Sequence, residues 1–279
     1  MVNHIIIRLM NIFSIFQRRN RILLKELVIT DFKLRYQGSV LGYLWSLLKP
    51  LLLFLILYLV FVRFLRFGSD VEHFPVYLLL GMVLWGFFTE ATMQGMHSII
   101  GRGDMIRKIN FPKYIIVISS TISALINLLL NLVVVLIFVV LNGVDVKSTV
   151  LLLPLNILEL YILALAIAFF LSALMVKYRD ISYIWEVLLQ GAFYATPIIY
   201  TLTMVIQSSE PAAKILLLNP VSQVIQDARY NLITHQTITT GRYIENPYIA
   251  AIPYLLVIIF VIASGLYFRK NSKHFAENI

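Results

Sequence analysis

The sequence contains no cysteine, and charged residues make up only 13% of its 279 positions. The absence of cysteine excludes a disulfide framework and a metal site built on thiolates. Soluble domains have about 25% charged residues, so a chain with this little charge cannot cover itself with a water-soluble surface. Hydrophobic residues instead supply 60% of the sequence and are spread over nearly its whole length. This composition indicates a membrane protein.

A nucleotide-binding loop and a catalytic cluster are also missing from the sequence. No G-x-x-x-x-G-K-S/T motif occurs, so the chain has no P-loop that would hold the phosphates of ATP. The acidic residues near the predicted membrane edges form no paired-carboxylate motif, and the five histidines are scattered. We therefore predict no catalytic residue and no metal site on this chain. Energy for any work would have to come from another subunit or from an ion gradient.

The formal net charge of +9 comes from lysine and arginine residues that lie in short segments between apolar runs. No basic stripe interleaved with aromatic residues lies outside this membrane pattern, so we predict no nucleic-acid partner. Lysine and arginine are concentrated in the N-terminal segment, the second and fourth connections and the tail. The positive-inside rule therefore predicts that both termini lie in the cytoplasm.

Six apolar runs are each bounded by charged residues, glycine or proline. Each run is near or above the roughly 20 residues that an α-helix needs to cross the hydrocarbon core. We therefore predict an all-α membrane protein with six transmembrane helices. The predicted spans are Val40–Phe64, Pro75–Gly95, Tyr114–Leu141, Val150–Val176, Tyr183–Tyr200 and Tyr248–Phe268.

The segment before the first span is predicted to contain an amphipathic helix that lies in the membrane interface. Apolar Leu24, Val28 and Phe32 recur at every fourth position, while polar residues turn the other way. This pattern is typical of a helix lying on a membrane surface. The predicted organisation is a cytoplasmic interfacial-helix region over residues 1–39, a transmembrane domain over 40–268 and a cytoplasmic tail over 269–279.

The stretch Thr201–Pro247 is long for a simple loop. It contains two segments of helical character, Ala212–Leu218 and Val221–Ile233, and Asn219-Pro220 separates them as a turn and helix restart. Neither segment can span the membrane alone. We predict a re-entrant helical hairpin between the fifth and sixth spans, which is permitted where irregular backbone is buried in protein or lines a cavity. An external helical cap is the alternative.

Three ionisable residues lie within or at the edge of the apolar runs, namely Lys49, Glu90 and Glu159. Such residues are candidates for function, because burying a charge in a membrane costs a few kcal/mol or more. Lys49 is near the cytoplasmic surface, so snorkelling to that surface is its alternative role. Solvation in a cavity is the alternative for Glu90.

Aromatic residues near the ends of the runs suit the interfacial belts of a membrane protein. Trp85, Phe87 and Phe88 lie deeper than the others. Their faces are suited to stacking on sugar rings, so they join Glu90 as candidates for a translocation path. Contact with lipid or with the protein core is the alternative.

Four strings along the chain resemble the ABC-2 type permeases that export polysaccharides, O-antigens and teichoic acids. They occur in the order found in that family and cover nearly the full chain. The sequence looks closest to the permeases for rhamnose-rich polysaccharides and teichoic acids of Gram-positive bacteria. The strings are DFKLRYQGSVLGYLWSLLKP at 31–50, RKINFPK at 107–113, RDIS at 179–182 with ATPIIY at 195–200, and LNPV at 218–221.

The resemblance implies a homodimer of permeases in the bacterial inner membrane, bound to two separate cytoplasmic ATPase subunits. ATP and magnesium would be bound by those subunits, and this chain would bind no cofactor. The N-terminal helix and the loop Ser98–Pro112 would contact the ATPase, with the loop as a short coupling helix; a solvated loop is the alternative. The mixed charges that suit this loop to a polar partner belong to Arg102, Asp104, Arg107 and Lys108.

The implied substrate is a polysaccharide or teichoic acid, carried on polyprenyl pyrophosphate and moved from the cytoplasm across the membrane. Its diphosphate requires cations at the cytoplasmic surface, and the candidates are Lys33, Arg35 and Lys49. Attraction to anionic lipid is their alternative role. The family also has re-entrant gating helices between the last two spans, so Asn219 and Pro220 would belong to an external gate.

Two other classes of protein would share some of these features. A ligase or glycosyltransferase acting on polyprenyl-linked sugars would have interfacial basic residues, but it should also carry an acidic or histidine cluster facing a large external loop. An ion-coupled secondary transporter typically has inverted repeats with broken helices in both halves. The sequence lacks the cluster, and only its second half has a clear break, so both classes rank below the permease.

Overall fold

The computed structural model describes residues 18–68 and 71–278, except for the side chains of Arg35 and Tyr36. The described chain folds into helices joined by short connections, and no strand occurs in it. The all-α class is therefore confirmed.

The longer helices are α2 (Arg18–Tyr36), α3 (Trp45–Leu57), α4 (Phe74–Ser98), α6 (Tyr114–Leu141), α7 (Leu153–Lys177), α8 (Ile181–Ala195), α11 (Pro220–Leu232) and α14 (Ile252–Asn271). The shorter ones are η2 (Gly42–Leu44), η3 (Tyr58–Phe64), η4 (Ile100–Arg102), α5 (Gly103–Lys108), η5 (Ser148–Leu152), α9 (Leu202–Ser208), α10 (Glu210–Leu218), α12 (Thr240–Tyr243), α13 (Pro247–Ala250), η6 (Ser272–His274) and α15 (Phe275–Asn278).

Five helical stretches of the described chain are long and apolar enough to cross a membrane. They match the first, second, third, fourth and sixth predicted spans. A chain with several such helices is a multi-pass membrane protein. The five stretches are Gly42–Phe64, Phe74–Ser98, Tyr114–Leu141, Ser148–Lys177 and Ile252–Asn278.

The fifth predicted span, Tyr183–Tyr200, is wrong at its C-terminal end. Helix α8 has 15 residues and ends at Ala195, and a helix of that length measures about 22 Å at 1.5 Å per residue. The reason is local, because a residue before proline is driven out of the helical conformation. Thr196 precedes Pro197 and is extended, with φ −106° and ψ 135°.

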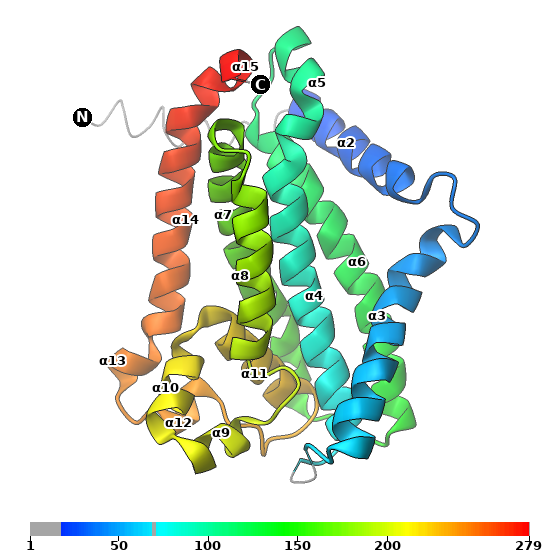
Figure 1. The fold of residues 1–279 in the computed structure, drawn as a ribbon, viewed down its shortest axis with the longest axis vertical. Helices are drawn as coiled ribbons and strands as arrows, with labels where there is room; N and C mark the ends of the chain where they lie inside the picture. Colours follow the sequence, from blue (N-terminus) through cyan, green and yellow to red (C-terminus); the bar gives the residue numbers. More distant parts are fainter. Residues whose placement is uncertain (1–17, 69–70, 279) are drawn as a thin grey trace.

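Helix α4 forms the centre of the bundle, with α6 and α7 beside it and α14 against α7 (Figure 1). It is the most buried of the five stretches, whereas the stretch containing α3 is the least buried. Small residues allow α4 and α7 to approach closely, since a Cβ added to Gly95 would lie 2.4 Å from the Cβ of Ala168. Close contact through glycine and alanine is typical of membrane helix pairs.

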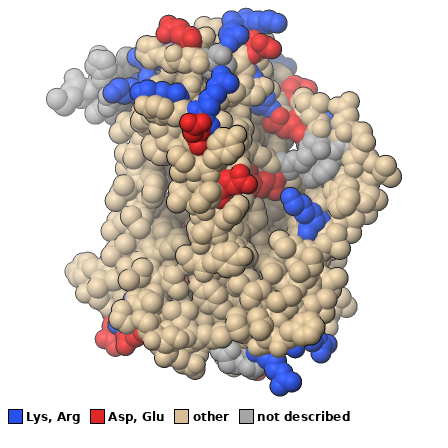
Figure 2. Space-filling view, viewed as in Figure 1, with Lys and Arg blue, Asp and Glu red and all other residues tan. Residues whose placement is uncertain are grey.

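The two ends of the bundle differ. Helices α2, α5 and α15 lie at one end, which we name the α5 end, and α9–α13 lie at the other, which we name the α11 end (Figure 1). Figure 2 shows most charged side chains toward the two ends and a few near mid-height, with an uncharged band between these and the α11 end. Such a band is what a bilayer requires of the surface that it surrounds.

Helix α2 contains the predicted amphipathic pattern and packs against α6. Leu27 and Asn20 are buried against the bundle, whereas Lys33 and Leu34 are exposed. The helical nature of this segment agrees with the prediction, while its position in a membrane interface stays a prediction. The first 17 residues of the predicted interfacial region lie outside the described part of the chain.

Candidate functional sites

The helical hairpin at the α11 end turns at Asn219 and Pro220. Asn219 is the N-cap of α11, and its Oδ1 accepts a hydrogen bond of 3.0 Å from the backbone N–H of Val221. Pro220 is the first helical residue, where its missing N–H has no cost. The predicted break between two short helices is therefore confirmed, and a re-entrant position and a gating role for Asn219 and Pro220 stay predictions.

Arg229, on α11, has a role that the sequence analysis missed. Its side chain is fully buried. Its Nε donates to the carbonyl of Tyr77 at 3.0 Å, and its two Nη atoms donate to the carbonyls of Pro197 at 2.5 Å and Ile198 at 2.8 Å. The guanidinium also donates to Gln226 Oε1 at 3.1 Å and lies 3.7 Å from the centroid of the Tyr77 ring. Carbonyl oxygens and an aromatic face, rather than a carboxylate, thus hold this charge in the described structure.

The contacts of Arg229 join three parts of the molecule. Tyr77 belongs to α4, Arg229 belongs to α11, and Pro197 and Ile198 follow the end of α8. The planar fork of five N–H donors on arginine reaches acceptors on several sides at once, whereas the three N–H donors of a lysine ammonium all lie on one nitrogen. Arg229 therefore fixes the hairpin to the central helix and to the end of α8.

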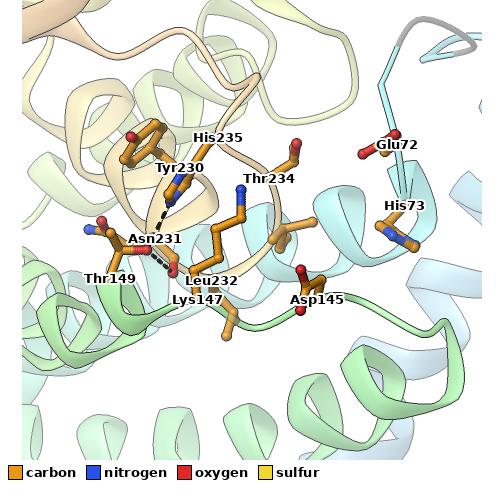
Figure 3. A pocket seen from close by; sticks show the side chains of 11 residues that line it. Glu72, His73, Asp145, Lys147, Thr149, Tyr230, Asn231, Leu232, Thr234 and His235 are labelled. Atoms are coloured by element: carbon orange, nitrogen blue, oxygen red, sulfur yellow. Dashed lines mark hydrogen bonds between the residues drawn. The ribbon is translucent and has the colours of Figure 1, made fainter.

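A small cavity of about 140 Å³ opens at the α11 end (Figure 3). The connection before α4, the segment between α6 and α7, and the last turn of α11 with the residues after it form this cavity. His235 hydrogen-bonds through Nε2 to Thr149 Oγ1 at 3.0 Å, and its ring stacks on Tyr230 with centroids 4.4 Å apart. Partial burial lowers the pKa of His235, and the nearby cations Lys147 and Arg242 lower it further.

The three aromatic path candidates are buried in the protomer. Trp85 packs against Phe88 and Phe193 with ring centroids 5.7 and 6.0 Å away, and Phe87 stacks on Tyr161 at 6.5 Å. All three rings belong to the main hydrophobic core. Contact with a substrate would thus require the helices to move.

Glu90, the fourth path candidate, is only half-buried and lies in a polar seam between α4 and α6. Its Oε1 accepts hydrogen bonds from Gln94 Nε2 at 2.9 Å and from Asn127 Nδ2 at 2.7 Å. One turn further along α6, Asn131 Nδ2 donates to the carbonyl of Ser46 at 3.2 Å, which reaches α3. These amides replace part of the hydration that a carboxylate loses inside a membrane.

The seam continues a polar stripe along α6 that the sequence analysis did not note. Ser119, Ser123, Asn127 and Asn131 are all buried. Residues four apart lie on one face of a helix, so the spacing itself was a signal for this stripe. It runs from the α5 end toward α3.

The turn at the α5 end carries the four predicted coupling residues. Short helices η4 and α5 join α4 to α6 here. Asp104, Arg107 and Lys108 are exposed, whereas Ile106 is buried and anchors α5. Three of the four predicted residues are thus available to a partner.

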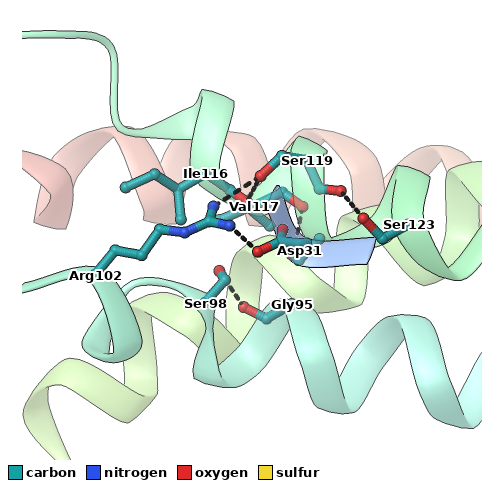
Figure 4. Close-up of polar contacts among 9 residues, drawn as sticks. Asp31, Gly95, Ser98, Arg102, Ile116, Val117, Ser119 and Ser123 are labelled. Carbon is teal, nitrogen blue, oxygen red and sulfur yellow. Dashed lines mark hydrogen bonds and ion pairs between the residues drawn. The ribbon is translucent and has the colours of Figure 1, made fainter. Parts of the chain in front are cut away.

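Arg102, the fourth coupling candidate, points inward (Figure 4). Its Nη2 forms an ion pair with Asp31 of α2, and its Nη1 donates to Ser119 Oγ of α6 at 2.9 Å. The two charged side chains are only 17% and 25% exposed. Removing one of them would leave a largely desolvated charge, at a cost on the order of 3 kcal/mol. Arg102 therefore ties the turn to α2 and α6.

The diphosphate candidates are not gathered at one site. Lys33 lines an open cavity of about 440 Å³ between α2 and η2, together with Thr30, Gln37 and Tyr43. Lys49 is exposed on α3 and does not line this cavity. The side chain of Arg35 lies outside the described part of the structure, although its backbone lies on α2. Lys33 is thus the candidate with a space beside it.

These features define a multi-pass helical membrane protein with a charged helical turn at one end and a helical hairpin at the other. No group of three or more potential metal ligands occurs among the described residues. The chain belongs to the ABC-2 type transporter family, whose pattern it matches over residues 22–233.

Similar proteins share nearly the full length of the chain. It is 30% identical over 257 residues to the O-antigen export system permease protein RfbA of Myxococcus xanthus, covering 92% of this chain and 95% of that protein. A protein of the same name from Klebsiella pneumoniae is 27% identical over 248 residues, covering 88% and 91% of the two chains. Membership of this family confirms that the chain is a transport subunit rather than an enzyme.

Proposed function

We propose that this chain is the transmembrane subunit of an exporter that moves a polysaccharide linked to polyprenyl pyrophosphate across the bacterial inner membrane. ATP hydrolysed with magnesium on a separate cytoplasmic subunit would drive the movement. The names of the relatives, which are O-antigen export permeases, support a polysaccharide as the cargo. Teichoic acid is the related polymer that the resemblance also suggests.

The observation that carries this proposal is the turn at the α5 end. Helix α5 presents Asp104, Arg107 and Lys108 at the surface, while Arg102 ties the same turn to α2 and α6. A partner that displaces α5 would therefore move two longer helices as well. A displacement of α5 by the ATPase would in this way be transmitted to helices of the membrane bundle.

In this proposal the α5 end is cytoplasmic and the α11 end is external, as the distribution of lysine and arginine indicates. The chain crosses the membrane six times and assembles as a homodimer with two ATPases. Support for a sixth crossing comes from α7, which ends at the α5 end, while α14 begins at the α11 end (Figure 1). Helix α8 runs between the two ends, and the hairpin that follows it in the chain completes the crossing at the α11 end.

The proposed mechanism alternates between two states of the dimer. The lipid diphosphate binds near Lys33, whose side chain lines the cavity beside α2. Binding of ATP draws the ATPases together, α5 transmits the displacement, and the hairpin held by Arg229 moves to open the external side. Coupling of this kind requires that nucleotide and substrate each have different affinities for the two states.

A test is to purify the chain with its cognate ATPase and to measure ATP hydrolysis. We expect the two to co-purify and the permease to change the hydrolysis rate. In Asp31→Asn, assembly should persist while this effect on the rate falls, because Arg102 loses its charged partner. Glu26→Gln, which changes an exposed acid of the same helix, should behave as wild type. A permease that never co-purifies with an ATPase would contradict the proposal.

A further inference from the structure

The cavity at the α11 end is bordered by charged side chains that have no partner among the described residues. In the described part of the chain, the side chains of Glu72, Asp145 and Lys147 form no hydrogen bond or ion pair, although all three residues line the cavity. Figure 3 shows Lys147 between the Tyr230–His235 pair on one side and Asp145 and Glu72 on the other. Two carboxylate acceptors and one ammonium donor therefore face the same small space.

The opposite wall of the cavity is fixed by its own contacts. Thr149 Oγ1 donates to the carbonyl of Asn231 at 3.1 Å and bonds His235 Nε2 at 3.0 Å. Tyr230 stacks on His235, and Arg242 lies over the Tyr230 ring at 4.3 Å. These contacts use none of the three unpaired charged groups. The cavity is thus preformed on one side and keeps free hydrogen-bonding capacity on the other.

The size of the cavity suits one six-membered ring. Its volume is about 140 Å³, and a protein cavity of about 150 Å³ is known to hold a benzene molecule. A larger unit would have to extend out through the opening. The space therefore suits a single residue of a polymer rather than a longer segment.

The chemistry of the lining favours a neutral hydroxylated ring. Each sugar hydroxyl both donates and accepts hydrogen bonds, and the lining offers both acceptors and a donor. An anionic ligand is disfavoured, because the lining has two acidic side chains, Glu72 and Asp145, against the one lysine, Lys147. The partial negative charge at the C-terminal end of α11 adds to this repulsion. An apolar ligand is disfavoured because it would desolvate these polar groups without pairing them.

We propose that this cavity is a binding subsite for one neutral pyranose residue of the exported polymer. The inference rests on the proposed function, which brings a polymer to this face of the molecule. The inference narrows the substrate class to uncharged glycans, because a polyol-phosphate chain would place its phosphates next to the two carboxylates. A glycan of uncharged sugars is the polymer that the cavity fits.

The test is ligand-observed NMR on the purified full-length chain in detergent. The probes are the methyl glycosides of glucose, galactose, mannose and rhamnose, with glycerol 3-phosphate as the anionic probe. We expect at least one glycoside to bind and glycerol 3-phosphate not to compete with it. Asp145→Asn and Lys147→Ala should each weaken that binding at least tenfold. Both residues are exposed and lie in a connection, so the fold should tolerate their replacement, and a thermal unfolding midpoint checks this.

Matched controls come from the same end of the molecule. Glu210 and Lys214 are exposed on α10, pair with each other at 2.7 Å and lie outside the cavity. Glu210→Gln and Lys214→Ala should leave sugar binding unchanged. Binding of no glycoside, or equal binding by the Asp145 and Lys147 variants, would overturn the inference. Preferential binding of glycerol 3-phosphate would overturn the proposed ligand class.

Failure of this inference is distinguishable from failure of the proposed function. A chain that assembles with an ATPase but binds none of the glycosides contradicts the subsite alone. A chain that binds a glycoside but never assembles with an ATPase contradicts the exporter alone. The two experiments use different preparations and different readouts.

Discussion

At the scale of single residues, Arg229 holds three elements together at the α11 end. Four hydrogen bonds and the face of Tyr77 surround its guanidinium. Hydrogen bonds to a charged group contribute about 1.5–3 kcal/mol each, and they offset the loss of water around the buried cation. The arrangement leaves little free space, because a Cβ added to Gly81 would lie 2.3 Å from Nη2 of Arg229.

We therefore expect Gly81→Ala to destabilise the protein by about 1–3 kcal/mol, the usual cost of overpacking a core. Gly86, on the same helix, has no atom within 4 Å of an added Cβ. Gly86→Ala should be neutral or should stabilise the helix by about 0.5–1 kcal/mol. Thermal unfolding midpoints of the two variants in detergent provide the comparison. Equal midpoints would contradict the close packing around Arg229.

His235 makes the stability of the α11 end depend on pH. Its pKa is lowered in the folded protein by partial burial and by the cations Lys147 and Arg242. The neutral ring is thus favoured by folding, and protonation favours the unfolded state. This contribution is complete above about pH 6.5, the ordinary pKa of histidine, and is lost as the pH falls toward the folded-state pKa.

The unfolding midpoint should accordingly fall between pH 7.5 and pH 5, and His235→Gln should show a smaller fall. A pH series of thermal scans on both proteins measures the difference. Identical pH dependences for wild type and His235→Gln would show that another group is responsible.

At the scale of elements, α5 is the helix that we propose contacts the ATPase. Arg107 and Lys108 are exposed at the last turn of this helix. Reversing both charges should weaken association with the ATPase at least tenfold, because like charges would face each other across the contact. Lys273→Glu, an exposed charge change near the same end, serves as the control. A pull-down titration measures the affinity for the ATPase. Unchanged binding by the double variant would show that the ATPase contacts another part of the chain.

Elements defined by local chemistry could be predicted from the sequence. The break at Asn219-Pro220 is such a case, since an N-cap followed by proline begins a helix whatever its surroundings. The apolar runs predicted five spans correctly for a similar reason, because the length and hydropathy of a segment determine whether it can cross a bilayer. The end of α8 could have been found as well, since Pro197 is visible in the sequence, but the apolar residues after it extended the prediction to Tyr200.

Features that depend on distant partners could not be predicted. The family resemblance predicts that Arg102 contacts the ATPase, whereas Arg102 pairs with Asp31, which is 71 residues away in the sequence. Arg229 and its acceptor Tyr77 are 152 residues apart. The residues next to each arginine in the sequence do not indicate which distant acceptors it contacts. The burial of Trp85, Phe87 and Phe88 likewise results from packing against other helices.

At the scale of the whole molecule, the number of crossings depends on α8. The chain has no cysteine, so a single introduced cysteine is the only thiol available to a reagent. Ser182→Cys lies at the start of α8, and Ser208→Cys lies at the end of α9. In right-side-out membrane vesicles, a membrane-impermeant maleimide should label Ser208→Cys, and it should label Ser182→Cys only after permeabilisation. The same labelling of both positions would contradict a crossing by α8.

ATP-driven transport in proteoliposomes tests directly whether this chain is the permease of an exporter. The chain and its ATPase are reconstituted together with a lipid-linked polysaccharide, and the fraction of polymer protected from an external glycosidase is measured. ATP should increase this fraction only when both subunits are present, and Asp31→Asn should reduce the increase. Equal protection without ATP, or without the ATPase, would contradict the assignment of this chain as the permease of an ATP-driven exporter.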